Sequence, residues 1–455
     1  MRHVLTLAAL LGACQPAWSF DLLQAWQAAA AHDPEFAAAR AAADAGQARR
    51  REASALWRPT IGLQAGVARA TSEMATTGAR FSAPGFGQST GVNFDTSVTG
   101  GTSTRYGVEI RQPLYSAERS AQGQQLNAAA DAAAAAWQGS QQDLMVRAAQ
   151  RYFDAALAEQ QLRLLGQQEA AAEHARVEAE DRFRLGDRPV TDVHEAAARA
   201  SALKAQRLTA ANDLQFKRVL LADLTGTAEA GPLVVPAATP AMGPLGRLED
   251  WLERAAHDNP QVRAAQAQLR SAEDEARKTA ALVSPTLDLI ARAGRDRLSG
   301  SGDFGAASNT STQRALGVEL NVPLYTGGWR SARHDETTAL VAKARSELER
   351  ARLLATQGTR AAWLDLSAGQ ERIGALEAGL KASRARLEAT KLGLEVGDRT
   401  TLDVLNAEND AAAAELALVQ ARIALITQRL SLAASAGSLD ETELTAANRA
   451  LLASP

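Results

Sequence analysis

The sequence predicts a mixed membrane protein in which short transmembrane β-strands are joined to long coiled-coil helices. Three observations predict this class. The chain is duplicated, each half holds one pair of alternating strands, and each half holds one uninterrupted helical segment of about 70 residues. The composition agrees, because 46% of the residues are hydrophobic but only 4% are aromatic, and alanine makes up much of the hydrophobic share. Alanine favours helix and fills little core volume, so closely packed long helices are expected instead of compact globules.

The duplication is clearest in two turns, GDRPVTDVHEA at residues 186–196 and GDRTTLDVLNA at residues 397–407. They lie 397 − 186 = 211 residues apart, and the motif PLY at residues 113–115 recurs at 323–325. In each turn a glycine and an aspartate end one Ala-rich segment, and a Thr, Asp or Pro opens the next. Each turn therefore predicts the end of one helix and the start of another.

The first 19 residues are typical of an export signal. A basic start precedes an apolar run that Pro16 interrupts, and small residues at positions 17 and 19 would permit cleavage before Phe20. The run is too short to span a bilayer. An alternative is a lipoprotein signal, LGAC, in which Cys14 is acylated, and the sequence leaves both open.

Two segments, residues 58–113 and 285–323, each predict a β-hairpin. Their strands are expected to be about ten residues long, joined by Gly/Ser-rich loops at 71–102 and about 298–312, and about ten tilted residues span a membrane. Apolar residues alternate with polar ones, so the charges fall on one face, as a polar lumen surrounded by lipid requires: Glu109, Arg111, Asp288, Arg292 and Glu319. Four strands cannot close a barrel, and open edges are not tolerated in lipid. The strands must be shared between chains, of which two are conceivable and three would give 3 × 4 = 12 strands.

The helical segments 116–185 and 327–396 would each reach roughly 105 Å. The return helices, 190–225 and 401–435, are half as long, so the opening segments 21–56 and 246–283 are expected to stack end to end with them. On the last return helix one heptad stripe runs from Leu405 to Ala433 and a second from Val404 to Leu432. Two stripes predict packing on both neighbours. The expected order is a signal at 1–19, a first repeat at 20–225, an equatorial linker at 226–245, a second repeat at 246–435 and an equatorial tail at 436–455.

Taken together, these segments resemble the TolC family of outer-membrane export ducts. The resemblance rests on an ordered set of motifs, including FDLLQAWQAAAAHDPEF, RPTIGL, SPTLDL, VPLYTGGW, the paired turns and SAGSLDETEL. It implies a homotrimer with a 12-stranded barrel in the outer membrane, continuous with a periplasmic helical barrel. It also implies passive efflux or type I secretion of proteins or small molecules. The partners would be a periplasmic adaptor, an inner-membrane ABC or proton-driven transporter, and outer-membrane lipid.

By resemblance, Arg399 and Asp192, with Thr191 beside it, are candidates for a polar lock that keeps the periplasmic end closed. The family often has a tyrosine where this chain has Leu394, so one hydrogen bond of such a lock is absent here. The alternative is that Arg399 is simply a solvated charge near a helix start. An exposed ion pair contributes only about 0 to 1 kcal/mol, although threefold repetition would add to it.

The candidate pore constriction is Asp403, which matches a carboxylate that family members project into the entrance. Three copies around an axis would favour cations. The family's second carboxylate is replaced here by Asn406, which halves the charge of the ring unless Glu408 substitutes. A carboxylate that stabilises the helix macrodipole would account for Asp403 equally well.

Two further sets of candidate residues are identified by where they lie along the chain, at the helix turns and at the strand–helix junctions. The turns are where adaptor hairpins dock in the family, although as sequence they are only helix terminators: Gly186, Asp187, Gly397 and Asp398. Four aromatic residues fall where strand meets helix and predict a belt at the membrane boundary, with ordinary packing as the alternative: Trp57, Tyr115, Tyr325 and Trp329.

The sequence favours no other class of function. Net charge is −3 without a basic block, so no nucleic-acid partner is expected. The six histidines show no metal-ligand spacing, and GSGDFG at residues 300–305 lies between strands without a following helix, so no enzyme, cofactor or metal is predicted. The alternative function is a periplasmic coiled-coil scaffold or adaptor without a pore. Such a protein would need no alternating-strand hairpins.

Overall fold

The computed structural model describes residues 20–85, 87–187, 189–228, 231–240, 243–302 and 305–452. The expected export signal, and Cys14 with it, lies outside the described residues. The described residues divide into two compact units. Those within Met1–Gly46, Asp131–Gln266 and Ser346–Pro455 form what we call the helical unit, and those within Gln47–Ala130 and Ala267–Arg345 form the sheet unit.

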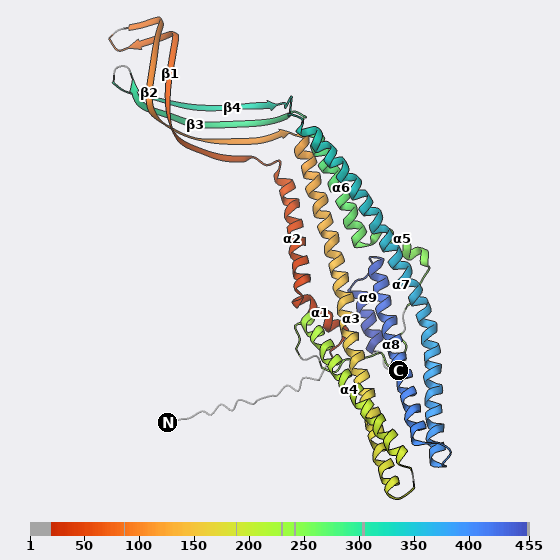
Figure 1. Cartoon of the computed structure of the whole chain (residues 1–455). Coiled ribbons are helices and arrows are strands. Elements are labelled where there is room, and N and C mark those ends of the chain that lie inside the picture. The colour runs from red at the N-terminus through yellow and green to blue at the C-terminus, as the bar shows by residue number, and fades with distance from the viewer. Residues whose placement is uncertain are drawn as a thin grey trace, which may run out of the picture. The chain divides into compact units, whose positions relative to one another are not determined.

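The sheet unit holds one antiparallel sheet in the strand order β1-β2-β3-β4 (Figure 1). The strands are β1 (Thr60–Ala83), β2 (Gly87–Tyr115), β3 (Thr286–Gly302) and β4 (Gly305–Asn321). The two hairpins are joined because β2 also pairs with β3, with Glu109 opposite Arg292. Within the described residues β1 and β4 each pair along one side only, so the sheet has two open edges.

The prediction of loops at 71–102 and about 298–312 is wrong, because most of the described residues of both segments lie in paired strands. The strands are 24, 29, 17 and 17 residues long, well beyond the expected ten. Threonine and serine suit a pleated surface, and their hydroxyls bond across the pair, as Thr99 does to the Ser301 carbonyl at 3.0 Å. The glycines in these segments suggested loops. In the structure, glycine instead occurs at irregularities of strand pairing, such as Gly100 in β2, where φ is 61°.

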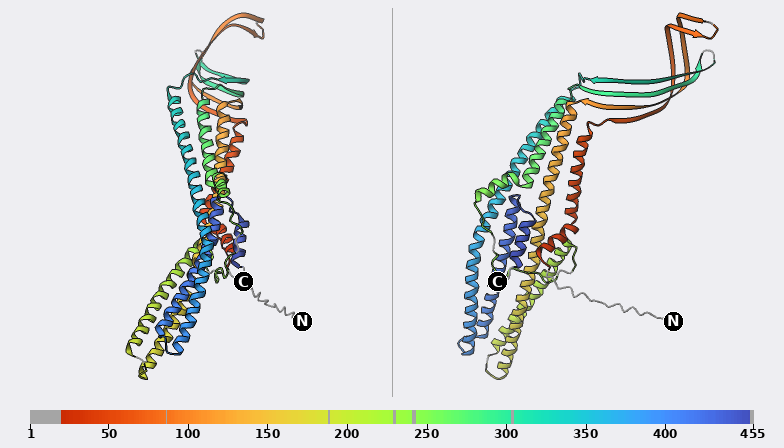
Figure 2. Two further views of the ribbon diagram at one scale, coloured as in Figure 1. Left: turned by 90° about the vertical axis from the view of Figure 1, so that its right-hand side faces the viewer. Right: turned by 180° about the vertical axis from the view of Figure 1, so that it is seen from behind.

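The long helices are arranged in two antiparallel hairpins, α3 with α4 and α7 with α8 (Figures 1 and 2). The helices are α1 (Leu22–His32), α2 (Pro34–Ala55), α3 (Ala117–Arg184), α4 (Val190–Thr225), α5 (Leu248–Asp258), α6 (Pro260–Ala281), α7 (Trp329–Glu395), α8 (Thr401–Ser435) and α9 (Glu441–Leu452). The C-terminal tail thus contains a helix, α9, which buries Leu444 and Leu451 in the core of the helical unit.

The two heptad stripes of α8 are confirmed. Val419, Ile426 and Ala433 of the first stripe are buried in a cluster with Tyr152 and Phe153 of α3. Residues of the second stripe are buried in a different cluster with helix α7: Leu418, Leu425 and Leu432, against Leu366, Ile373 and Leu380. Helix α8 is long and apolar enough to cross a membrane, yet half of its most apolar window is buried in the fold. Packing on both sides therefore accounts for its apolar character.

The end of each return helix abuts the end of an opening helix, at equivalent places in the two repeats. Gly226 follows α4 and Gly437 follows α8, again 437 − 226 = 211 residues apart, and both have positive φ. A Cβ on Gly226 would lie 2.6 Å from the His32 ring, and one on Gly437 would lie 2.3 Å from the Asp258 carbonyl oxygen. Only glycine allows this close approach, which supports the expected end-to-end packing of the short helices.

The linker between the repeats is fixed to the helical unit at two points. The Tyr152 hydroxyl accepts a hydrogen bond from the Val234 N–H at 2.9 Å, and burial raises the pKa of Tyr152 to about 12. Arg422 donates to the Ala237 carbonyl and to Glu377, whose pKa is lowered by a hydrogen bond from Thr239 and then by Arg422. The linker therefore packs beside α9 in the same unit.

Candidate functional site

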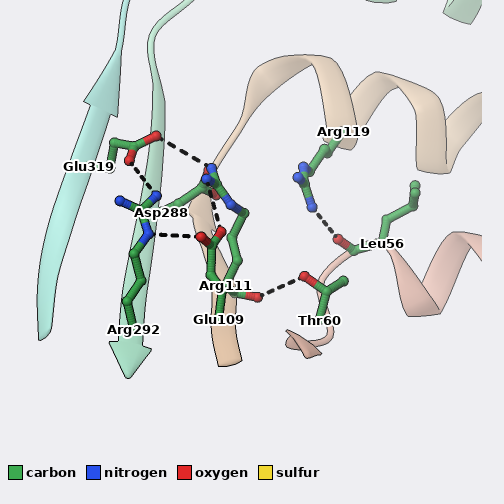
Figure 3. A network of polar contacts seen from close by, with 8 residues as sticks. All are labelled: Leu56, Thr60, Glu109, Arg111, Arg119, Asp288, Arg292 and Glu319. Atoms are coloured by element: carbon green, nitrogen blue, oxygen red, sulfur yellow. Dashed lines mark hydrogen bonds and ion pairs between the residues drawn. The ribbon is translucent and has the colours of Figure 1, made fainter. Parts of the chain in front are cut away.

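One face of the sheet carries a connected network of charges that crosses three strands (Figure 3). Arg111 of β2 lies 3.0 Å from the Asp288 carboxylate of β3 and 3.5 Å from Glu319 of β4. Arg292 of β3 lies 2.8 Å from Glu109 and 3.5 Å from Glu319. Each arginine thus contacts at least two carboxylates, which holds the side chains along the sheet surface.

Strand register produces this network. Glu109 is directly opposite Arg292, whereas Asp288 is directly opposite Glu319, and this like-charged pair is bridged by Arg111, which contacts both carboxylates. Farther from the helices the pattern continues with Arg105 and Asp296, 2.5 Å apart. Over residues 102–113, 287–299 and 308–321, three arginines and four carboxylates lie on this surface, a difference of 3 − 4 = −1. The face is polar yet nearly balanced, which suits a water-filled wall that does not strongly select by charge.

The opposite face of the sheet is apolar and exposed. Ile61 is 72% exposed, Leu63 77%, Leu316 76% and Leu320 64%. They occupy alternate positions on the two edge strands, while Val108 and Ile110 lie on β2 between them. A contiguous apolar surface of this kind is avoided in water, whereas a lipid-facing barrel wall requires it.

At the other functional region, in the helical unit, the two sequence-matched turns have the same backbone hydrogen bonds. Asp187 N–H donates to the Arg182 carbonyl at 2.9 Å, and Asp398 N–H donates to the Gly393 carbonyl at 2.8 Å, 211 residues farther on. Gly186 and Gly397 have φ of 76° and 82°, the left-handed conformation that ends a helix. The four docking-turn residues therefore form two equivalent, exposed helix ends.

The two helix starts after these turns differ. Thr400 caps α8, and the Asp403 carboxylate accepts from the Thr400 N–H and hydroxyl, both at 2.8 Å. These two hydrogen bonds lower the pKa of Asp403, and the one from the Thr400 N–H has the larger effect. The charge of Arg399 lowers the pKa further. The equivalent residues in the first repeat are Pro189 and Asp192, and Pro189 makes no side-chain cap bond. Asp403 is thus held at its own helix start, as the macrodipole interpretation requires.

The structure brings Asp192 close to the start of α8. Asp192 and Thr400 line one cavity of about 180 Å³, together with residues of three helices: Ala175, Glu178, Ala179, Arg182, Glu195, Ala196, Thr401, Leu402 and Leu405. The Arg399 side chain lies against Gly393 of α7, where a Cβ would meet its Cγ at 2.6 Å. Thr191 and Asn406 are exposed and Leu394 is half-buried. The lock and constriction roles of these residues stay predictions.

A further contact between the two helix hairpins was not expected from the sequence. Glu415 of α8 lies 3.2 Å from Arg163 of α3 and 2.9 Å from Arg384 of α7, and it accepts from Gln160 at 3.4 Å. Gln168 and Asn409 form another cross-hairpin hydrogen bond, at 3.4 Å. Arg163 and Glu415 are 252 residues apart, so no local pattern reveals the pair. Glu408, the alternative carboxylate near the constriction, lies 3.7 Å from Lys391.

The four predicted rim aromatics lie at strand–helix junctions and are exposed. Trp57 is 38% exposed, Tyr115 53%, Tyr325 87% and Trp329 58%. Within one chain, ordinary packing does not account for them. Val322 and Leu324 lie in the same junction and are also exposed. Among the described residues, no three His, Cys, Asp or Glu side chains are placed to hold a metal ion.

Known proteins are similar to this chain over nearly its whole length. The outer membrane efflux protein family matches residues 25–227 and 251–438, one stretch in each repeat. The outer membrane protein TolC of Vibrio cholerae is 28% identical over 99% of this chain and 99% of its own length. The alkaline protease secretion protein AprF of Pseudomonas aeruginosa is 27% identical over 98% and 92%, respectively. The solved structure of the outer membrane protein VceC of Vibrio cholerae has a TM-score of 0.69 at 19% identity, covering 91% of this chain and 96% of VceC.

Proposed function

Because the chain belongs to the outer membrane efflux protein family, we propose that three copies form one passive export duct through the outer membrane and into the periplasm. The observation that carries this proposal is the sheet. It has one exposed apolar face, one polar face with paired charges, and two open edges. Such a sheet is stable in a bilayer only when further strands cover both edges, which a closed ring of three chains provides.

The wall of this duct has the polar face of the sheet inward. Its arginines and carboxylates are nearly balanced in number and mutually paired, so cargo of either charge meets a weak field. No chemical step is assigned to the chain, and energy for export must come from an inner-membrane transporter. This matches a passive role and leaves the choice of cargo to the partner.

The experiment that tests the proposal is single-channel recording of the purified full-length protein in a planar bilayer. We expect defined conductance steps, together with a trimer that resists detergent and mild heating because its barrel is closed by interchain strands. A protein that gives no conductance and no heat-resistant β-structure in membranes would instead be the periplasmic scaffold or adaptor that the long helices alone permit.

The gate is assigned to the helix ends. We place the lock between Asp192, which lines the cavity beside α8, and Arg399 at the α7–α8 turn, and we add the Arg163–Glu415 pair as a second tie between the two helix hairpins. Opening then means separation of α7–α8 from α3–α4. Asp403 lies at the start of α8 in the same region and is the proposed cation-attracting constriction.

The two helix turns are the proposed docking site for the partner proteins of the duct. Gly186, Asp187, Gly397 and Asp398 form exposed, equivalent helix ends, and the cavity lined by Asp192 and Thr400, a few residues beyond each turn, is large enough for an inserted side chain. We propose that a periplasmic adaptor docks there and connects the duct to an inner-membrane transporter. Similarity to AprF over nearly the whole chain favours type I secretion of a protein cargo over drug efflux.

A further inference from the structure

The apolar face of the sheet carries an unexpected group of arginines. Arg69 of β1, Arg295 and Arg297 of β3, and Arg314 of β4 occupy the same strand parity as Leu63, Leu289 and Leu316. All four are exposed. They therefore lie on the surface assigned to lipid, on the side nearer the hairpin turns, and not on the polar wall. We call them the arginine patch.

At its own level of the sheet, the arginine patch has no counter-charge on the same face. Over residues 60–69, 102–113, 287–299 and 308–321, every carboxylate falls on the opposite face: Glu109, Asp288, Asp296 and Glu319. Within the described residues, none of the four guanidinium groups makes an ion pair or side-chain hydrogen bond. Four cations thus share one surface without a partner, whereas each arginine of the network on the other face is paired.

The height of Arg295 and Arg297 on the sheet is that of a membrane boundary. Tyr115 is the rim aromatic of β2 and pairs with Leu287, so Arg295 and Arg297 lie eight and ten residues farther along β3. At about 3.4 Å per residue and a strand tilt of about 40°, they stand roughly 21 to 26 Å above the rim, which matches the apolar band of about 25 Å in outer-membrane barrels. An arginine is costly at mid-bilayer and nearly neutral at the interface, so the patch marks the second interface.

We propose that the arginine patch binds lipid headgroups that carry phosphate monoesters, in the leaflet on the hairpin side of the membrane. A phosphate monoester offers free oxygens and up to two negative charges, which match bidentate bonds from two neighbouring guanidinium groups. Arg295 and Arg297 supply such a pair on one strand, and Arg314 lies diagonally beside Arg295 on the next. The apolar side chains next to the patch would contact the acyl chains of the same lipid.

This proposal rests on the barrel of the proposed function, so both are measured on one sample. Full-length protein would be reconstituted in phosphatidylcholine vesicles that contain either a bis-phosphorylated lipid A or the same glycolipid with its phosphates removed. Lipid that remains bound to the trimer would be counted by native mass spectrometry, and conductance would be recorded in parallel. Loss of conductance in every sample would overturn the duct, whereas normal conductance without lipid retention would overturn only the patch.

For the unaltered protein we expect the phosphorylated glycolipid to be enriched about tenfold over the dephosphorylated form. The double variant Arg295→Gln, Arg297→Gln should lose that preference and keep its conductance. Arg105→Gln is the matched control, because Arg105 lies at the same level on the other face, paired with Asp296. It should retain the preference in full.

Three outcomes would overturn the proposal. The first is equal enrichment in the double variant and the unaltered protein. The second is equal enrichment of phosphatidylglycerol, which carries only a phosphodiester, because the surface would then respond to charge alone. The third is displacement of the glycolipid by excess inorganic phosphate, which would show that the arginines bind the free ion and gain nothing from the adjoining apolar surface.

Discussion

Replacing Glu415 by Gln should raise the closed-state current of the duct. Glu415 bonds across the helix hairpins to Arg163 at 3.2 Å and to Gln160 at 3.4 Å, while its contact with Arg384 stays within α7–α8. Only the contacts to α3 must break when the hairpins separate. The substitution removes the charge and keeps the size of the side chain, so the helix packing around it is preserved.

The size of the effect expected for Glu415→Gln follows from how exposed the Glu415 and Arg163 side chains are. The side chain of Glu415 is 26% exposed and that of Arg163 50%, so the ion pair is largely screened and belongs at the modest end of the range for surface pairs. With the weak bond to Gln160, the cross-hairpin tie contributes about 1 kcal/mol per chain. Three chains give about 3 kcal/mol, which is roughly a hundredfold change in the open-to-closed ratio. High salt should shrink this difference, because the Debye length falls to about 3 Å at 1 M.

Closed-state current in planar bilayers, at low and high salt, measures the effect. Glu371→Gln on α7 is the matched control, because Glu371 is exposed and makes no ion pair with any described residue. Arg163→Gln should reproduce the effect, and the double variant should add little, as expected when both residues serve one interaction. Equal currents from Glu415→Gln and Glu371→Gln would refute the assignment of Glu415 to the gate.

Three other predictions concern the helix ends. Arg399→Glu should raise closed-state current, and an unchanged current would count against the lock with Asp192. Asp403→Ala should reduce block by multivalent cations; in the unaltered protein the block should persist as pH falls to about 4, because the pKa of Asp403 lies below its usual 3.8 and the carboxylate stays charged. Gly437→Ala should destabilise the chain by more than about 3 kcal/mol in thermal unfolding, because a Cβ would meet the Asp258 carbonyl oxygen at 2.3 Å and φ is 74°. Gly397→Ala, with similar φ and open space, should cost only about 1 kcal/mol.

The sequence predicts well those features that depend on a pattern repeated along the chain. The stripe that contains Leu418 and Leu425 has a seven-residue period, which predicted its burial against a neighbouring helix, and the structure shows that this helix is α7. The polar strand face could be predicted as well, because Glu109 and Arg292 each alternate with apolar residues along their own strands. In the helical unit, the two glycine turns were found because the same motif appears twice.

What the sequence could not supply depends on contacts between distant segments or on the length of strand pairing. The Arg163–Glu415 pair joins residues 252 positions apart, and nothing near either one marks it. The outer halves of the hairpins were read as loops because their Gly and Ser content resembles loop composition, although cross-strand hydrogen bonds keep them paired. The capping box of α8 joins Thr400 and Asp403, three residues apart, and it accounts for the position of Asp403.

The duplicated turns show how one ancestral helix start can take two roles. Position 403 equals 192 + 211, so Asp403 and Asp192 are equivalent, yet only Asp403 has a threonine cap to bond. Pro189 has no backbone N–H and no hydroxyl, so Asp192 cannot form that capping box and lines the cavity beside α8. Pro189→Thr should restore the box, because residue 189 is already extended as Thr400 is, and should stabilise the start of α4 by about 1 kcal/mol. By drawing Asp192 to its own helix it should also raise the closed-state current. A more stable protein with an unchanged current would show that Asp192 takes no part in the lock.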